Sequence, residues 1–271
     1  MNHVYILGGL RSYIGVKDGM YRHIPAEKLG AEVLREVVSR FELPTDAIDY
    51  IIGGNAVGGG GNITRLAALS AGFPERIPAV TLDLQCGSAL EAISAAAAKI
   101  ESGMADLVIA GGMESSSVQP YRMMSPNHPE YDGGKVYTVA QFVPGKRGEQ
   151  VMLEGAEETA IRENVSKEEM DTWVLRSHKR AAQARKEGIL EDITVSIDGS
   201  SRGMRESVRQ MSQRLIDRLP YLLPNGTKNH GGKCVPDARW RGICGTLFGT
   251  VFAGTGTESR MPFPVWYSDR G

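Results

Sequence analysis

Short apolar runs alternate with stretches of helical spacing along the first half of the chain. Each run stops at glycine or aspartate, which is typical of a strand buried on both faces of a sheet. These predicted strands cover residues 4–7, 50–52, 79–82 and 107–110. Between them, residues 26–41 and 88–103 carry apolar side chains at helical intervals, which predicts two amphipathic helices. Strands that alternate with helices predict an α/β protein built on a layered sheet.

The pattern changes after about residue 113. Prolines and glycines are frequent up to about residue 148, so we expect surface loops rather than long regular elements there. Ser166 is followed three residues later by Glu169, the spacing of a capping box, and Gly188 is a typical helix terminator. The sequence therefore predicts a helix over residues 166–188.

Composition excludes several classes of protein. The chain has 271 residues, of which 41% are hydrophobic and 23% are charged, and its formal net charge is −1. This balance argues against a disordered chain and against electrostatic binding to nucleic acid. The sequence shows neither a secretory signal nor an apolar run long enough to cross a membrane, so we expect no membrane partner.

The cysteines indicate the compartment. Cys86, Cys234 and Cys244 form no CxxC pair, so we expect neither a disulfide framework nor a metal site. A reducing environment suits such a chain, and we expect a cytoplasmic location.

Cys86 is the candidate nucleophile. It follows the predicted strand at 79–82 and precedes Gly87, Ser88 and an alanine-rich helix. A thiol at the amino end of a helix lies near partial positive charge and unpaired N–H groups, which favour the reactive thiolate. The alternative is that Cys86 is a small buried hydrophobe, as unpaired cysteines often are.

Two segments carry a resemblance to a known family. Residues 83–92 (DLQCGSALEA) resemble the nucleophile segment of the thiolase family, and residues 110–117 (AGGMESSS) resemble its glycine-methionine-glutamate segment. The second segment favours a thiolase over other condensing enzymes, such as a ketoacyl synthase. Residues 58–74 are similar to the segment with which thiolases approach their dimer partner. The resemblance extends to about residue 227.

The resemblance implies a layered α-β-α fold and acyl transfer from coenzyme A. Cys86 would carry the acyl group as a thioester and pass it to a carbon nucleophile, or act in the reverse cleavage of a 3-oxoacyl-CoA. Met113 and Met152 would contact the substrate. Val151 stands where many short-chain thiolases carry a histidine, so the acyl length stays open. Acyl-CoA thioesters are the expected substrates, with no further cofactor, and the complete fold would form a homodimer or tetramer.

The family also implies groups that this chain does not carry in recognisable form. Thiolases take a general base from a Gly-His-Pro-like turn and a second cysteine from a Cys-x-Gly turn, both in a second α/β half. We therefore expect an amino-terminal core over residues 1–114, a loop domain over 115–227 that is mostly helical after 148, an unrelated tail over 228–271, and no carboxy-terminal half. Asn229-His230 and Cys244-Gly245 resemble those turns only superficially.

A shifted reading frame accounts for the tail. Codons for residues 229–243, read one nucleotide later, permit the sequence ITAGNACLTHDGAAF, which resembles what thiolases carry at this point. We therefore predict that the residues after about Thr227 are translated out of frame. The alternative to an active enzyme is an inactive, truncated remnant that binds at most coenzyme A or a partner subunit.

Overall fold

The computed structural model describes residues 3–139, 141, 143–145, 151–197 and 243–255, the last of these as backbone only. The chain forms two compact units. The first joins Met1–Pro120, Ile193–Ile197 and Gly242–Gly271, and the second joins Tyr121–Asp192 and Asp198–Arg241.

A mixed sheet forms the middle of the first unit. Its strands follow the order β4-β3-β5-β9-β1-β8, and the short strand β2 pairs with β9. β3 is parallel to β4 and β5, whereas β9 runs antiparallel to both of its neighbours, β5 and β1. The strands are β1 (His3–Ser12), β2 (Gly15–Val16), β3 (Tyr50–Gly54), β4 (Ala79–Leu82), β5 (Leu107–Ser115), β8 (Thr194–Val195) and β9 (Ile243–Thr255).

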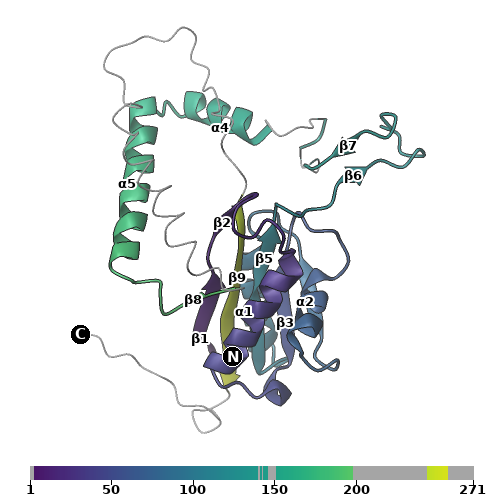
Figure 1. The fold of residues 1–271 in the computed structure, drawn as a ribbon, viewed down its shortest axis with the longest axis vertical. Helices are drawn as coiled ribbons and strands as arrows, with labels where there is room; N and C mark the ends of the chain where they lie inside the picture. Colours follow the sequence, from purple (N-terminus) through teal and green to yellow (C-terminus); the bar gives the residue numbers. More distant parts are fainter. Residues whose placement is uncertain (1–2, 140, 142, 146–150, 198–242, 256–271) are drawn as a thin grey trace. The chain divides into compact units, whose positions relative to one another are not determined.

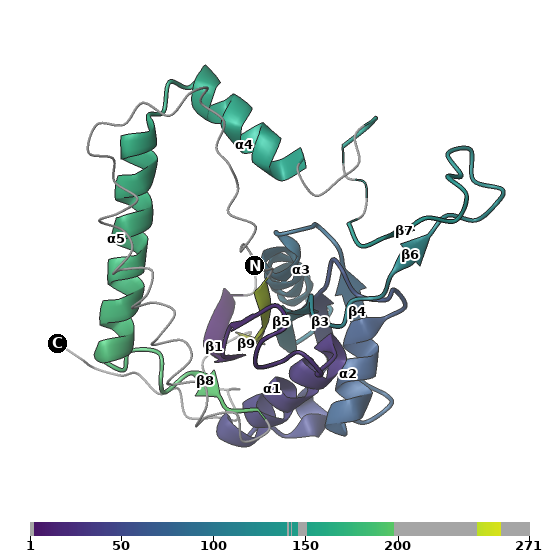
Figure 2. The same cartoon turned by 45° about the horizontal axis from the view of Figure 1, so that its top comes forward.

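Helices cover both faces of this sheet. Helices α1 (Ala26–Arg40) and α2 (Ile63–Ala71) lie on one face and α3 (Ser88–Glu101) on the other, as Figures 1 and 2 show; a 3-10 turn, η1 (Thr45–Ala47), precedes β3. Successive strand residues point to opposite faces, so Ile51 packs in the α1 cluster and Ile52 in the α3 cluster. The predicted three-layer α/β architecture is confirmed.

The strands differ in how well they match the prediction of burial on both faces. β3 and β5 are almost wholly buried, as predicted. The prediction is wrong for β1, where Tyr5 is 43% and Ile6 is 65% exposed. The reason is its place in the sheet, because β8 pairs only with Arg11 and Ser12 and leaves the first half of β1 as an edge.

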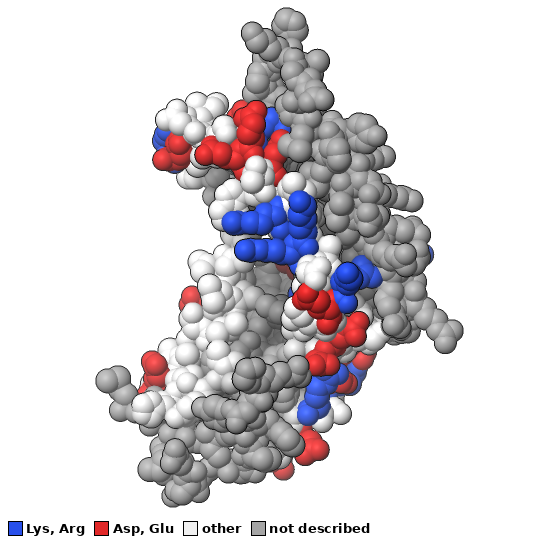
Figure 3. All heavy atoms as spheres, turned by 90° about the vertical axis from the view of Figure 1, so that its left-hand side faces the viewer, with Lys and Arg blue, Asp and Glu red and all other residues white. Residues whose placement is uncertain are grey.

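In its described residues, the second unit contains two helices and a small hairpin. α4 (Val151–Arg162) and α5 (Lys167–Lys186) are its helices, and β6 (Arg122–Met123) pairs with β7 (Val136–Tyr137). The loop-rich stretch before α4 and the helix after Ser166 are as predicted. Figure 3 shows Lys and Arg side chains next to Asp and Glu side chains on the face drawn there.

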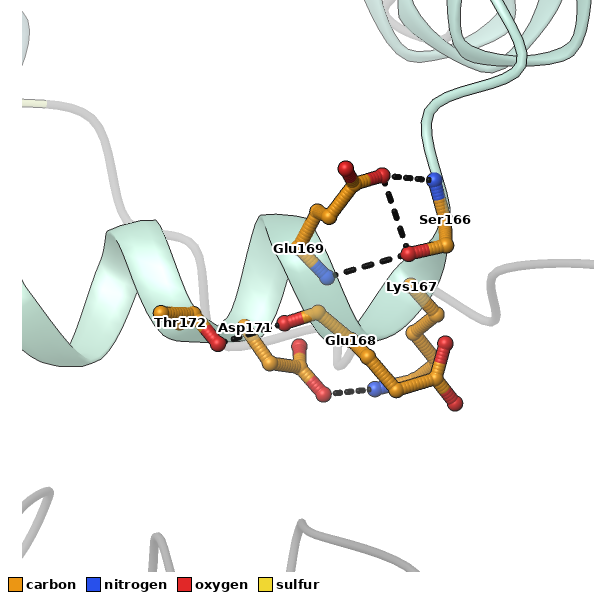
Figure 4. A network of polar contacts seen from close by, with 6 residues as sticks. All are labelled: Ser166, Lys167, Glu168, Glu169, Asp171 and Thr172. Carbon is orange, nitrogen blue, oxygen red and sulfur yellow. Dashed lines mark hydrogen bonds and ion pairs between the residues drawn. The ribbon is translucent and has the colours of Figure 1, made fainter.

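The start of α5 is the predicted capping box (Figure 4). Ser166 Oγ accepts a hydrogen bond from the backbone N–H of Glu169 at 3.2 Å, and Glu169 Oε2 accepts one from the backbone N–H of Ser166 at 2.8 Å. The Ser166 hydroxyl also donates to Glu169 Oε2 at 3.0 Å, and the backbone and hydroxyl bonds that the carboxylate accepts from Ser166 hold the pKa of Glu169 below its ordinary value. Lys167 Nζ pairs with Asp171 one turn further on at 2.5 Å. In the part of the chain described, no helix is long and apolar enough to cross a membrane.

The buried Tyr21 makes the stability of the first unit depend on pH. Its side chain is fully buried, and burial raises the pKa of Tyr21 from 10.0 to about 12. A raised pKa in the folded state means that stability is intact below pH 10 and falls as the pH rises toward 12. Between neutral pH and about pH 11, we expect the free energy of unfolding of the native chain to fall by about 1 kcal/mol more than that of Tyr21→Phe. Urea unfolding of both chains at neutral pH and about pH 11 measures this difference, and equal losses would contradict it.

Candidate active site

The candidate nucleophile lies where parallel strands end. β4 ends at Leu82, residues 83–87 form a turn, and α3 begins at Ser88. In open α/β sheets, ligands bind beyond the carboxyl ends of the parallel strands. Cys86 lies in this turn and is exposed, so the strand-to-helix position predicted for it is confirmed. The alternative of a buried structural cysteine is wrong.

Backbone and side-chain hydrogen bonds close the turn around Cys86. The N–H of Gly87 donates to the carbonyl of Leu84 at 3.0 Å, and the N–H of Ser88 donates to the carbonyl of Gln85 at 3.1 Å. Gln85 has a φ of +51°, in the left-handed region that non-glycine residues rarely adopt. The candidate nucleophile therefore follows directly after a constrained residue.

Two glycines allow the amino end of α3 to approach the sheet. A Cβ atom on Gly54, the last residue of β3, would lie 2.5 Å from the carbonyl carbon of Ser88 and 2.6 Å from the nitrogen of Ala89. A Cβ atom on Gly112 in β5 would lie 2.9 Å from the Cβ of Ala89. Only glycine fits at such distances, so the position of the helix end depends on these two residues.

A carboxylate ties the loop after β3 to the end of β5. Glu114 Oε2 accepts hydrogen bonds from the backbone N–H groups of Ala56 at 3.1 Å and Val57 at 3.0 Å. Its Oε1 accepts from Asn55 Nδ2 at 3.1 Å, and the same nitrogen donates to the carbonyl of Met113 at 2.8 Å. The edge of the sheet beside the Cys86 turn is thus braced by a network of Asn55 and Glu114.

The surroundings of the thiol are apolar and open. Leu84 and Leu90, close to Cys86 in the chain, are 58% and 69% exposed. Among the described residues, none forms a hydrogen bond with the thiol, and none belongs to a cluster of ligands that could hold a metal ion. The described part of the site therefore consists of the candidate nucleophile and its supporting turn, without a base in contact with the sulfur.

The other predicted site residues lie in different surroundings. Met113 is 3% exposed and packs in the core on the α1 face, where its backbone carbonyl accepts the bond from Asn55. Met152 is 62% exposed and lies on α4, in an apolar groove of about 580 Å³ within the second unit. Met113 thus lies on the face of the sheet opposite α3, Met152 belongs to the other unit, and the contact of both with substrate stays a prediction. His230 and Cys234 lie outside the described residues, and the side chain of Cys244 is not described.

Sequence reasoning missed the residues that support the turn. Ser88 and Asp83 were present in the segment that resembles thiolases, but their hydrogen bonds depend on how the chain bends. Asn55 gave no local signal, because its partners lie 58 and 59 residues further along the chain. A polar residue directly after a buried strand was the available hint, since active-site loops start there.

Gly54→Ala tests the close approach of α3 to the sheet. The added methyl group meets backbone atoms that cannot rotate away, so we expect a loss of about 1–3 kcal/mol in the free energy of unfolding. Gly155→Ala is the matched control, because a Cβ there meets nothing within 4 Å and α4 should gain up to about 1 kcal/mol in helix propensity. Urea unfolding measures both, and equal stability of the Gly54→Ala and native chains would contradict the packing described.

Fold and site together define a layered α/β protein with an exposed cysteine at a strand-to-helix junction. The family model "Thiolase, N-terminal domain" matches residues 4–227. The chain belongs to the thiolase family.

Curated relatives and a solved structure agree with this assignment. The chain is 32% identical over 239 residues to "Putative acetyl-CoA C-acetyltransferase VraB" of Staphylococcus haemolyticus, covering 87% of this chain and 62% of the relative. It is 32% identical over 240 residues to the protein of the same name from Staphylococcus aureus strain MW2, covering 63% of that relative. The crystal structure of the Bacillus anthracis acetyl-CoA acetyltransferase superposes with a TM-score of 0.65 and 30% identity, over 72% of this chain and 50% of that one. The chain thus spans less than two thirds of the length of these relatives.

Proposed function

We propose that the chain transfers acyl groups between coenzyme A and Cys86. The observation that carries this proposal is the exposed thiol of Cys86 in a braced turn at the start of α3, in a member of the thiolase family. The relatives bear the name "Putative acetyl-CoA C-acetyltransferase" and the solved neighbour the name acetyl-CoA acetyltransferase, which supports acetyl-CoA as the acyl donor.

The proposed step is a thioester exchange. The Cys86 thiolate attacks the carbonyl carbon of the acyl-CoA, and the bond between that carbon and the sulfur of coenzyme A breaks. Coenzyme A leaves as a thiolate and takes up the proton that Cys86 lost. In the complete reaction, a carbon nucleophile would then displace Cys86 from the acyl group, or coenzyme A would do so in the cleavage direction.

The remaining site and assembly predictions belong to the same proposal. Contact of Met152 with the acyl-CoA is part of the proposal, as the family resemblance implies. Met113 is proposed to contact the acyl-CoA as well. A homodimer or tetramer is the assembly proposed for the complete fold.

Isotope exchange tests the acyl-transfer step without requiring the carbon nucleophile. Unlabelled acetyl-CoA and labelled free coenzyme A are mixed with the 271-residue chain, and label in the acetyl-CoA pool is followed. We expect slow exchange that requires the folded chain. The alternative of an inactive remnant, favoured by the lack of a base in contact with the thiol among the described residues, predicts binding of coenzyme A at most and no exchange.

We also propose that residues after about Thr227 are translated out of frame. The match to the family model ends at residue 227. Codons for residues 243–249, read one nucleotide later, permit Phe-Val-Val-Leu-Phe-Leu-Val, whereas the present frame holds glycine or threonine at three of these seven positions. An interior strand between β5 and β1, the place of β9, favours the apolar series because both its faces are covered. Sequencing the DNA around the codons for residues 227–229 tests this directly.

A further inference from the structure

The residue before the nucleophile is held in an unfavourable conformation. Gln85 adopts a φ of +51°, which an isolated glutamine would leave for the ordinary right-handed or extended regions. Its backbone N–H donates to Asp83 Oδ1 at 2.9 Å, and its carbonyl accepts from Ser88 Oγ at 2.6 Å. Side chains on both sides of Cys86 therefore fix the peptide groups of Gln85.

Ser88 is the better anchored of these two side chains. It is 5% exposed, whereas Asp83 is exposed to solvent. Its hydroxyl oxygen also accepts a hydrogen bond from the backbone N–H of Leu84 at 2.8 Å, so one hydroxyl bridges two consecutive residues of the turn. Water can replace a bond to the exposed Asp83, but it has little access to the buried hydroxyl.

The place of Ser88 in the fold makes this bridge rigid. Ser88 is the first residue of α3, and its backbone lies against Gly54 of β3. The hydroxyl therefore holds the turn that carries Cys86 in a fixed position relative to β3 and α3.

We propose that Ser88 is a positioning residue for Cys86, and that its hydroxyl sets the place from which the thiol attacks an acyl-CoA. This inference rests on the function proposed above. Without the hydroxyl, the N–H of Leu84 loses the partner described for it and Gln85 loses its tie to the helix. Gln85 then relaxes out of the left-handed region, and the backbone of Cys86 turns with it.

Ser88→Ala removes the hydroxyl and keeps the Cβ atom that packs against Gly54. We expect coenzyme A exchange at saturating acetyl-CoA to slow by roughly ten- to a hundredfold, because small errors in the placement of a reacting group have effects of this size. The acetyl-CoA concentration for half-maximal exchange should stay the same, since the serine does not touch the substrate. Ser94→Ala is the matched control: it removes an exposed hydroxyl from the same helix, where Ser94 Oγ donates to the carbonyl of Leu90 at 3.2 Å.

Two further variants separate positioning from stability. Ile100→Val weakens the packing of α3 far from the turn, so it should lower the melting temperature while leaving the exchange rate of the folded chain unchanged. Asn adopts the left-handed region more readily than glutamine, so Gln85→Asn combined with Ser88→Ala should recover part of the lost rate. A purely structural role of Ser88 predicts no such rescue.

Alkylation of Cys86 by iodoacetamide needs no coenzyme A, so its rate tests the positioning role of Ser88 separately from the proposed acyl transfer. Absence of exchange in the native chain contradicts the proposed function. If Ser88→Ala folds and Cys86 is alkylated as fast as in the native chain, the positioning role is wrong. We expect slower alkylation in Ser88→Ala, native rates in Ser94→Ala, and an intermediate rate in the double variant.

Discussion

Replacement of Cys86 by serine is expected to reduce acetyl loading and coenzyme A exchange to the background rate. A serine hydroxyl remains protonated near neutral pH and needs a base to act as a nucleophile, whereas a thiol supplies some thiolate by itself. Because no described residue forms a hydrogen bond with this side chain, serine at position 86 has no base in place to activate it. The change is small in volume, so the turn and α3 should keep their structure.

The matched controls for Cys86→Ser are Cys234→Ser and Cys244→Ser, which should load and exchange acetyl groups at the native rate. Binding of coenzyme A, measured by calorimetry, should be similar in all of these chains. Exchange that survives in Cys86→Ser would place the nucleophile elsewhere and would contradict the proposed mechanism.

The second large effect is expected from correction of the reading frame. A chain shifted by one nucleotide after about Thr227 and continued through the downstream open frame should cleave acetoacetyl-CoA with turnover, whereas the 271-residue chain should not. The reason is chemical, because each acid–base group restored near the thiol contributes roughly 10²–10⁴-fold in rate. The assay follows loss of acetoacetyl-CoA in the presence of free coenzyme A.

The same corrected chain with Cys86→Ser serves as its control and should be inactive. Two results would contradict the frame proposal: the present frame is confirmed in the DNA with no downstream frame that encodes the missing turns, or the 271-residue chain turns over acetoacetyl-CoA by itself.

Regular elements with a strong local signal could be predicted from the sequence. Helices α1 and α3 follow from their apolar spacing, and α5 follows from the capping box at Ser166 and Glu169. Helix α2 was missed because it has only nine residues, although Asn62 caps its amino end and Gly72, with a φ of +90°, ends it. Short helices owe most of their stability to packing, so their sequences carry little periodic signal.

Strand β9 lay beyond sequence reasoning for another reason. Its sequence places Gly-Thr pairs between short apolar stretches. No continuous apolar run therefore marked it as an interior strand. Its place is set by backbone pairing with β5 on one side and β1 on the other, which depends on strands more than a hundred residues away in the chain. Non-local pairing of this kind is invisible to a reading of local pattern.

The candidate site, too, could be predicted from the sequence only in part. The place of Cys86 could be predicted because a buried strand, a small turn and an alanine-rich helix follow one another in the sequence. The left-handed Gln85 and the bridging hydroxyl of Ser88 could not, because both arise from the way α3 packs against Gly54 and Gly112. Met113 is likewise buried because β5 is an interior strand of the sheet, and the glycine-methionine-glutamate segment did not predict this.

Mass spectrometry of the folded native chain after brief exposure to acetyl-CoA tests the central claim most directly. Proteolysis at mildly acidic pH preserves the thioester, and the peptides that contain Cys86, Cys234 and Cys244 are compared. We expect one acetyl group per chain, on the Cys86 peptide, released by hydroxylamine and absent after unfolding in urea before exposure. Equal acetylation of all three cysteines, or acetylation of Cys234 or Cys244 with Cys86 unmodified, would contradict it.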